Sequence, residues 1–514
     1  MTNTSSLAEE LQELPGSLPA YRAFVDADQW RRFCLQYSKA GGRLAALWGT
    51  DARPEGRGFL VHAVLISSDH WLWLTYCAGD EAPSFPDISD IFPAANRLQR
   101  AIYDLLGIQS DATDKRPWLR HAAWSCTSFP LRHDFDVSAL ACDSPDTYPF
   151  VAVQGNGVHE IGVGPIHAGT IEPGHFRLSV IGDEILRLEE RFGYAHKGVE
   201  KRFESFDLRE GIRLAARVCG DSTVAYSWAY AMAVEALCEC RVPHRAQWLR
   251  ALLLERERIA NHLGDIGAVS NDGGLAFGQT QFFLLKERWV QTNQCVFGHR
   301  YLMDTIIPGG VVYDINPENR RQMQEECETL QTAVRILQEI IDDHAGLQER
   351  FLGAGRVTMV QAQTLGAVGL IARASGLARD IRTEFPSLPY STLLAHTTTH
   401  PEGDVAARIA LRFDEIYESL RLIRDILSDL PDGPLVGDCD TNSGTAGLGC
   451  VEGWRGEVFV AIERGVFGHA HRVHIHDPSW QNWPLLEYAV IGDLVPDFPL
   501  INKSFNLAYS GHDL

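Results

Sequence analysis

Residues 217–235 read R-V-C-G-D-S-T-V-A-Y-S-W-A-Y-A-M-A-V-E, a glycine turn that leads into a helix of small and aromatic residues. The turn carries one cysteine, Cys219, and the helix carries Tyr226 and Tyr230. Because the two tyrosines are four residues apart, they lie on the same helix face. A thiol at a loop-to-helix junction followed by two tyrosines is typical of the wall of a redox pocket. The alternative is a buried core helix with a structural cysteine, since free cysteines are among the most buried residue types.

Length and charge set broad limits on the function. The chain has 514 residues, which is enough for two or three domains with a large core. Its formal net charge of −21 argues against a nucleic-acid binder and against a protein held directly by anionic lipids. No apolar run is long enough to predict a membrane span, and the N-terminal residues lack the pattern of a signal peptide. We therefore expect a cytoplasmic protein that, if it works at a membrane, is held there by another subunit.

Cysteine usage limits the metal and disulfide chemistry that the sequence predicts. The chain has 11 cysteines, an odd number without repeated spacing, and no C-x-x-C pair. A disulfide framework is therefore not expected in a cytoplasmic chain. Cys238 and Cys240 are separated by one residue, which is a poor spacing for metal ligands on a helix.

The hydrophobic pattern predicts an α+β protein. A small N-terminal α/β domain is followed by a large, mainly helical bundle that carries a β-hairpin and short peripheral strands. We assign residues 1–136 to the first domain, residues 137–156 to a linker and residues 157–514 to the second domain.

Periodicity places the individual elements. Amphipathic repeats predict long helices at 243–262, 318–344 and 404–430, and alternation at 176–188 predicts the hairpin. The run G-T-A-G-L-G (444–449) does not follow an apolar strand, so it does not predict a dinucleotide site. The remaining expectations are strands at 58–64, 71–76, 458–462 and 471–475, a helix at 92–106, a loop at 431–456 and an irregular tail at 485–514.

Short motifs follow one another through the second predicted domain. They read G-P-I-H-A-G (164–169), E-P-G-H-F-R-L (172–178), Y-A-H-K-G-V-E-K (194–201), R-V-C-G (217–220), V-P-H-R-A-Q (242–247), E-R-E-R-I-A-N-H-L (255–263), P-G-G-V (308–311), G-D-V-A-A-R (403–408), V-E-G-W-R-G-E (451–457) and D-P-S-W-Q-N-W (477–483). In this order they resemble the large subunits of membrane-bound [NiFe] hydrogenases and the homologous D subunit of respiratory complex I.

The N-terminal part carries a second resemblance. F-P-A-A (92–95), I-Y-D-L-L-G-I (102–108) and P-L-R-H-D-F (130–135) resemble the C subunit of complex I. A C-like domain fused to a D-like domain is the layout of formate hydrogenlyase-type (group 4) large subunits and of fused complex I subunits.

The hydrogenase resemblance implies a [NiFe] centre held by four thiolates from two C-x-x-C pairs, and the sequence departs from that pattern. In the first pair Cys219 is present, but Ser222 stands at the second position. The second pair is replaced by Ser479 and Asn482. A serine hydroxyl or an asparagine amide cannot replace a bridging thiolate. We therefore expect no metal and no cofactor bound by this chain, with the four residues as vestigial positions. Cys219 is then an inert survivor.

The resemblance to complex I implies a quinone headgroup pocket in place of the metal. Tyr230 matches a pocket tyrosine of that family, and Tyr226 stands where hydrogenases carry a histidine. A phenol can hydrogen-bond a quinone carbonyl and supply a proton. The alternative is two core tyrosines with satisfied hydroxyl groups.

Other candidates come from the hairpin loop and the bundle. His167 and His175 both fall in the loop that supplies the quinone-binding histidine in complex I, and the sequence does not decide between them. Asp272 has the spacing of the aspartate that pairs with that histidine, although it also suits a helix end. Glu172 matches a proton-relaying glutamate of hydrogenases.

Together these features predict the large peripheral-arm subunit of a complex I-like or hydrogenase-related membrane complex, an oxidoreductase subunit with a quinone as its substrate. The implied partners are a small subunit with a [4Fe–4S] cluster, like the B subunit of complex I, and antiporter-like membrane subunits that move ions. The implied location is the cytoplasmic face of a bacterial inner membrane. The alternatives are an active group 4 [NiFe] hydrogenase and a catalytically silent scaffold subunit.

Overall fold

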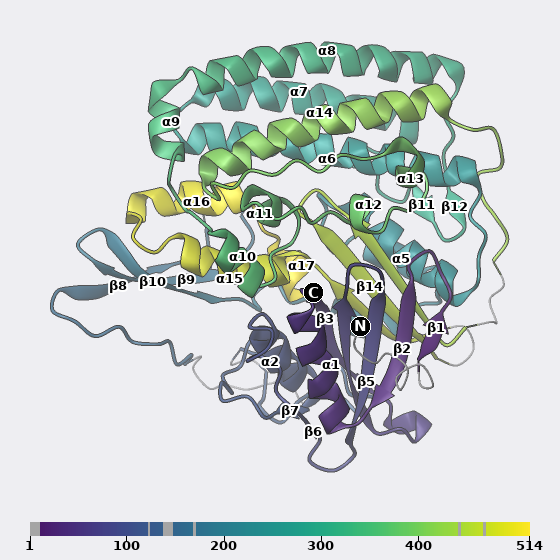
Figure 1. The fold of residues 1–514 in the computed structure, drawn as a ribbon, viewed down its shortest axis with the longest axis vertical. Helices are drawn as coiled ribbons and strands as arrows, with labels where there is room; N and C mark the ends of the chain where they lie inside the picture. The colour runs from purple at the N-terminus through teal and green to yellow at the C-terminus, as the bar shows by residue number, and fades with distance from the viewer. Residues whose placement is uncertain (1–10, 122–123, 137–146, 168–170, 440–443, 466–468) are drawn as a thin grey trace.

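The structure is a computed structural model, and it describes residues 11–121, 124–136, 147–167, 171–439, 444–465 and 469–514 (Figure 1). It confirms the expected α+β fold class, because an N-terminal sheet is followed by a large helical region with smaller sheets. None of the described helices combines the length and the apolar character needed to cross a membrane.

The N-terminal part is built on a five-stranded sheet in which only β2 and β5 run parallel. The predicted strands at 58–64 and 71–76 are confirmed as β4 and β5, and the predicted helix at 92–106 is confirmed as α2, which packs on β3. In sheet order the strands are β1 (Gln12–Leu14), β2 (Ala20–Val25), β5 (Trp71–Gly79), β4 (Phe59–Ile66) and β3 (Arg43–Asp51). The other elements here are α1 (Ala27–Lys39), η1 (Arg53–Glu55), β6 (Ser84–Phe85), α2 (Ala95–Leu106) and β7 (Gln109–Ser110).

The predicted hairpin forms two neighbouring strands of a three-stranded antiparallel sheet that projects from one side of the molecule (Figure 1). The strands of this sheet are β8 (Val158–Val163), β9 (His175–Ile181) and β10 (Glu184–Arg191). Gly182, with φ of 59°, makes the tight turn between β9 and β10. The loop between β8 and β9 carries several of the candidate residues, including His167 and Glu172.

Long helices form the upper part of Figure 1, where α6, α7, α8 and α14 lie in layers. The predictions at 318–344 and 404–430 are confirmed as α8 (Pro317–Asp342) and α14 (Val405–Asp429). The helix predicted at 243–262 is longer than expected, because α6 (His244–Asp272) continues for ten residues past His262. The other elements of this region are α3 (Val199–Phe203), α4 (Gly211–Ala215), α5 (Thr223–Leu237), α7 (Ala276–Phe297), β11 (Ile306–Ile307), β12 (Gly310–Val311), α9 (Ala345–Phe351), α10 (Met359–Thr364), α11 (Gly369–Ala374), α12 (Ile381–Glu384) and α13 (Tyr390–Leu393).

The expectation of a loop through 431–456 is wrong in its second half, because β13 (Ala446–Glu452) is the first strand of a buried sheet with β14 (Glu457–Arg464) and β15 (Ala470–His476). α5 packs directly across this strand. A Cβ atom on Gly447 or Gly449 would lie 2.1 or 2.0 Å from a carbonyl oxygen of α5. The glycines of G-T-A-G-L-G therefore allow α5 to approach β13 closely. The same high glycine content is what led us to predict a loop from the sequence.

The expectation of an irregular tail is also wrong. Residues 479–513 form α15 (Ser479–Ala489), η4 (Val495–Asp497), α16 (Phe498–Phe505) and α17 (Tyr509–Asp513), and most of them are buried. Pro496 and Pro499 stand in the first turns of η4 and α16. Proline is tolerated there because those amide positions make no intrahelical hydrogen bond.

One disulfide corrects the expectation from cysteine usage. Cys240, just after α5, is bonded to Cys439, which is 199 residues away in the sequence. Local spacing could not reveal this pair, because only the packing of the loop before β13 against the end of α5 brings the two thiols together.

The N-terminal sheet and the β13–β14–β15 sheet share buried polar and aromatic contacts. Arg22 of β2 is 2.8 Å from Glu463 of β14, and both side chains are buried. The ring of Trp48 stacks on His474 of β15 with centroids 4.7 Å apart. β15, which leads into the D-P-S-W segment, is thus fixed from two sides.

Candidate functional site

The loop at the start of α5 is joined to the turn between β13 and β14 by an ion pair with a buried arginine. Arg455 donates from Nη1 and Nη2 to the two carboxylate oxygens of Asp221, each at 2.7 Å. Burial acts to raise the pKa of Asp221, but the charge and the hydrogen bonds of Arg455 outweigh it and hold that pKa at about 2. The Cys219 thiol also donates to Asp221, at 3.0 Å.

A cavity of about 630 Å³ lies against this ion pair. It is enclosed by the β8–β9 loop, the start of α5, the end of α6 and the C-terminal helices. The cavity contains four of the positions singled out from the sequence: Cys219, His167, Glu172 and Asp272. The other polar residues on its wall are Asp221, Arg455, Asn502, Lys503, Asn506, Tyr509 and Ser510.

Cys219 and Ser222, the two positions of the first C-x-x-C pair that the resemblance implies, take part in this polar network. Arg455 Nη1 lies 3.9 Å from the Cys219 sulfur and 3.3 Å from the Ser222 hydroxyl. Ser222 also accepts from Trp454 Nε1 at 3.0 Å and donates to Asp221 at 3.0 Å. Burial, followed by the charge of Asp221, raises the pKa of Cys219 well above the usual value for a thiol. Cys219 is therefore a neutral thiol in this structure.

Ser479 and Asn482, the two positions of the second implied pair, make hydrogen bonds within the fold. Ser479 accepts from the Ala508 amide at 2.9 Å. Asn482 is paired with the backbone of Val368, accepting from N at 3.2 Å and donating to O at 3.1 Å. With one neutral thiol, two hydroxyl groups and one amide, the four positions do not fit a thiolate-bridged [NiFe] centre.

The structure places the two tyrosines of α5 outside the described cavity wall. The Tyr226 hydroxyl donates to Asp477, and Asp477 also accepts from the Ser479 amide at 2.7 Å. The Tyr230 hydroxyl donates to the Leu208 carbonyl at 3.0 Å, and its ring stacks on Phe203 with centroids 5.6 Å apart. Burial, followed by the nearby charge of Asp477, raises the pKa of Tyr226 well above 10. Both phenols thus have hydrogen-bond partners within the fold.

Of the two candidate histidines, His167 lines the cavity and His175 does not. His167 lines the cavity and hydrogen-bonds the Gly174 carbonyl through Nε2 at 2.8 Å. His175, the first residue of β9, does not line the cavity; its Nδ1 is 3.1 Å from the Gly164 carbonyl, and burial lowers its pKa. Glu172 lies on the cavity wall, where it accepts hydrogen bonds from the amide and the hydroxyl of Ser510 in α17.

The end of α6 faces α16 across the cavity. Asp272 is the last residue of α6, and burial raises its pKa although the positive charge of Lys503 acts in the opposite direction. Lys503 lines the same cavity and makes no hydrogen bond or ion pair with any described residue. Lys503 could not be predicted because its segment was expected to be irregular. Arg455 was not among the predicted residues, although the V-E-G-W-R-G-E motif contains it.

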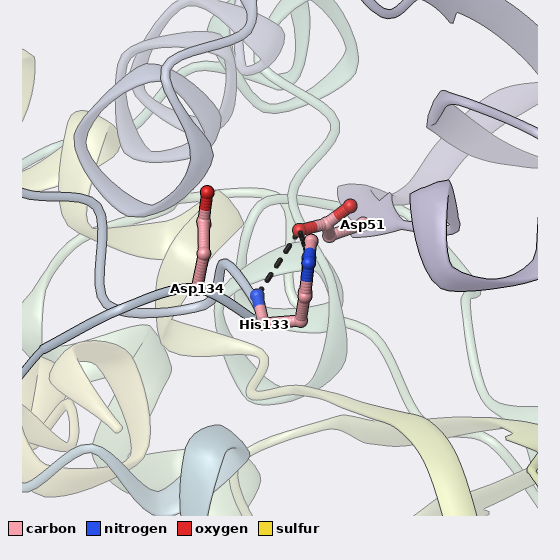
Figure 2. A group of neighbouring side chains, drawn as sticks. All are labelled: Asp51, His133 and Asp134. Carbon is pink, nitrogen blue, oxygen red and sulfur yellow. Dashed lines mark hydrogen bonds and ion pairs between the residues drawn. The ribbon is translucent and has the colours of Figure 1, made fainter.

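A separate cluster brings Asp51, His133 and Asp134 together at the surface (Figure 2). The His133 ring lies 2.9 Å from Asp51. Arg53, which is not drawn, lies 2.7 Å from Asp51 and 3.0 Å from Asp134. The guanidinium group of Arg53 already neutralises both carboxylates. We therefore interpret this cluster as a set of ion pairs that holds the P-L-R-H-D-F segment in place, and not as a metal site.

Comparison with known proteins agrees with the fold. The family model "Respiratory-chain NADH dehydrogenase, 30 Kd subunit" matches residues 23–140, and the model "Respiratory-chain NADH dehydrogenase, 49 Kd subunit" matches residues 272–445. Formate hydrogenlyase subunit 5 of Escherichia coli (strain K12) is 31% identical over 93% of this chain and 86% of its own length. Hydrogenase-4 component G of the same organism is 32% identical over 93% of this chain and 85% of its own length.

Two further relatives extend the comparison. The C/D subunit of the NADH-quinone oxidoreductase of Phocaeicola vulgatus is 28% identical over 84% of this chain and 87% of its own length. A chain of the archaeal membrane-bound sulfane sulfur reductase superposes with a TM-score of 0.66 at 26% identity, covering 70% of this chain and 99% of that chain. The chain belongs to the superfamily of group 4 hydrogenase-related large subunits and complex I D subunits, with an N-terminal part like the complex I C subunit.

Proposed function

We propose that the chain is the large peripheral subunit of a complex I-like or energy-converting hydrogenase-related membrane complex, and that its cavity binds a quinone as electron acceptor. The observation that carries this proposal is the cavity of about 630 Å³, which opens against Cys219, Asp221 and Arg455. The family resemblance assigns this loop to the metal, and the polypeptide has filled the metal positions with its own hydrogen bonds.

Three polar side chains on the wall have groups available to a ligand. Lys503 can donate to a quinone carbonyl and stabilise the negative charge that forms there on reduction. His167 donates from Nε2 to the Gly174 carbonyl, so Nδ1 of the neutral ring is an acceptor. Asp272, whose pKa is raised by burial, can hold a proton beside the cavity.

Reduction of a quinone to a quinol requires two electrons and two protons. In the proposed complex the two electrons come one at a time from a [4Fe–4S] cluster of a small partner subunit, and Asp272 delivers the two protons in turn, taking up a new proton between the two transfers. Glu172, held by Ser510 on the same wall, is the proposed site through which protons return from solvent. Tyr226, Tyr230 and His175 have no role in this step because they do not line the cavity.

The proposed partners are the Fe–S small subunit and antiporter-like membrane subunits, and proton uptake in the cavity would be coupled to ion movement by the latter. The proposed location is the cytoplasmic face of a bacterial inner membrane. Relatives with this layout support the assignment, since the sulfane sulfur reductase is described as a respiratory membrane complex. An active [NiFe] hydrogenase is disfavoured by the donor set, and a silent scaffold is disfavoured by the polar cavity.

The sulfane sulfur reductase likeness favours a second candidate acceptor, a polysulfide. A polysulfide is an anion, and Lys503 would then bind its charge before reduction as well as after it. The two candidates share the cavity and differ in the acceptor.

The test uses the purified membrane complex that contains this chain, with reduced benzyl viologen as electron donor. We expect decylubiquinone to be reduced, and we expect Lys503→Gln to raise its KM about tenfold. Reduction of polysulfide alone would replace the quinone with the second candidate. About one nickel per chain by elemental analysis would overturn the loss of the metal, and no acceptor reduction of any kind would favour the scaffold.

A further inference from the structure

The first amides of α5 donate no hydrogen bond to the side chain that normally accepts one. A helix begins with N–H groups that have no partner within the helix, and a serine at the preceding position usually accepts from one of them. Ser222 occupies that position, but its side chain makes no capping hydrogen bond. Its hydroxyl is engaged with Asp221, Trp454 and Arg455 instead.

A carboxyl group from the neighbouring helix takes over the capping function. Glu257 of α6 accepts from the Val224 amide at 2.7 Å and from the Ala225 amide at 3.1 Å. Its exposure is 5%, so it has no contact with bulk water that would explain its place there. Arg258, its neighbour in sequence, donates to Glu255 and to the carbonyls of Glu452 and Gly453.

The same two turns of α6 hold both sides of the Asp221–Arg455 ion pair. Asn261, one turn beyond Glu257, donates to the Asp221 carbonyl at 2.7 Å. Arg258 lies 2.6 Å from the Glu452 carbonyl and 2.9 Å from the Gly453 carbonyl, just before Arg455. α6 therefore fixes the loop that carries the carboxylate and the turn that carries the guanidinium group.

We infer that Glu257 is a positioning residue of the cavity. It caps α5 from α6 and so releases Ser222 to hold Arg455 against Asp221. Without this cap, Ser222 would turn toward its own helix, the Cys219–Ser222 loop would shift, and the ion pair at the cavity wall would lose its alignment. The effect on the acceptor rests on the proposed function; the effect on the loop does not.

The experiment compares Glu257→Met, which removes both acceptor oxygens, with Glu257→Gln, which keeps one. In the full-length chain at pH 7 we expect Glu257→Met to speed hydrogen exchange of the Val224 and Ala225 amides about tenfold, and to speed N-ethylmaleimide labelling of Cys219, both resolved by peptide. Glu257→Gln should give a smaller change in both. Asn261→Ala should speed labelling of Cys219 and leave the two amides protected, because the α5 cap remains.

The matched control is Asn316→Ala, which removes the side-chain cap of α8 (Asn316 Oδ1 accepts from Asn319 N at 2.7 Å) far from the cavity in sequence. It should change neither Cys219 labelling nor exchange at the start of α5. Wild-type rates of exchange and labelling in Glu257→Met would overturn the inference, and so would equal increases in the control.

The last measurement is the kinetics of acceptor reduction by the purified complex. We expect Glu257→Met to raise the KM for decylubiquinone more than it lowers kcat, because the residue shapes the site without touching the acceptor. A wild-type complex that reduces no quinone would refute the proposed acceptor, while the exchange and labelling results would still decide the role of Glu257.

Discussion

Arg455 and Asp221 form a bidentate ion pair, with two N–O distances of 2.7 Å, beside Cys219 and Ser222. The arginine comes from the turn after β13 and the aspartate from the loop before α5, 234 residues apart. The pair brings a positive charge into this loop, and the carboxylate of Asp221 neutralises it there.

Removing the carboxylate of this pair should destabilise the fold. Asp221→Asn leaves a buried guanidinium group without its counter-charge, and since the Asp221 side chain is 38% exposed we expect a loss of about 2 kcal/mol at pH 7. The pKa of Asp221 is lowered from 3.8 to about 2, so its contribution is present above pH 3.8 and is lost as the pH falls toward 2. Chemical denaturation at pH 7 and pH 3 measures this. An equal loss at both pH values would contradict the assignment.

Tyr230→Phe should affect stability and leave acceptor binding unchanged. The substitution removes one hydrogen bond to the Leu208 carbonyl, which corresponds to about 1 kcal/mol. Thermal unfolding and the KM for the acceptor check the two parts. A rise in KM comparable to that of Lys503→Gln would restore the sequence-based hypothesis that this tyrosine binds the quinone.

Lys503 should control the pH dependence of acceptor reduction. Its positive charge lowers the pKa of Asp272, against the larger effect of burial, so Lys503→Gln should raise that pKa further. A proton donor must be protonated to act, so the rate falls as the pH rises through its pKa. The alkaline limb of the pH–rate profile should therefore move to higher pH in Lys503→Gln. A limb that stays in place would remove Asp272 as the donor.

Glu257 should make the protein less stable as the pH rises. Burial raises its pKa from 4.5 to about 8, so the folded state keeps a proton that the unfolded state releases. The resulting stability is complete below pH 4.5 and is lost by roughly 1.4 kcal/mol per pH unit up to pH 8. Glu257→Gln cannot ionise and so does not lose this stability. The difference between its melting temperature and that of the wild type should therefore shift in favour of the variant as the pH rises from 5 to 8.

A surface carboxylate provides the comparison for that measurement. Glu287 of α7 is paired with Arg300, and its pKa is lowered to about 2 by that hydrogen bond. Glu287→Gln should therefore run parallel to wild type between pH 5 and 8. A pH-independent gap for Glu257→Gln as well would mean that Glu257 is ionised throughout the range.

The long helices could be predicted because their own sequences carry the signal. In α14, apolar residues from Val405 to Leu427 recur every three or four positions and lie buried. β13 could not be predicted in this way, because its glycines give no strand pattern. Gly447 and Gly449 are needed only because α5 packs closely against them, and that contact is not visible in the local sequence. α16 was missed because Pro499 is read as a breaker unless its place in the first turn is known.

The site was predicted in part for similar reasons. His167, Glu172 and Asp272 follow from motif resemblance, and the structure brings all three to one cavity. Lys503 and Glu257 depend on contacts between segments far apart in the sequence. The spacing of Tyr226 and Tyr230 predicts that they share a helix face. It does not predict which residues pack against that face, and in the structure these are Asp477 and Leu208.

The C-terminal helices have a consequence for how the molecule assembles. Glu172 is held by Ser510, 338 residues later, and α16 supplies the wall that carries Lys503. During synthesis the β8–β9 loop and α6 leave the ribosome long before these helices do. The cavity wall therefore cannot be complete before α16 and α17 have been made, and a chain cut short before α16 would lack the wall that carries Lys503.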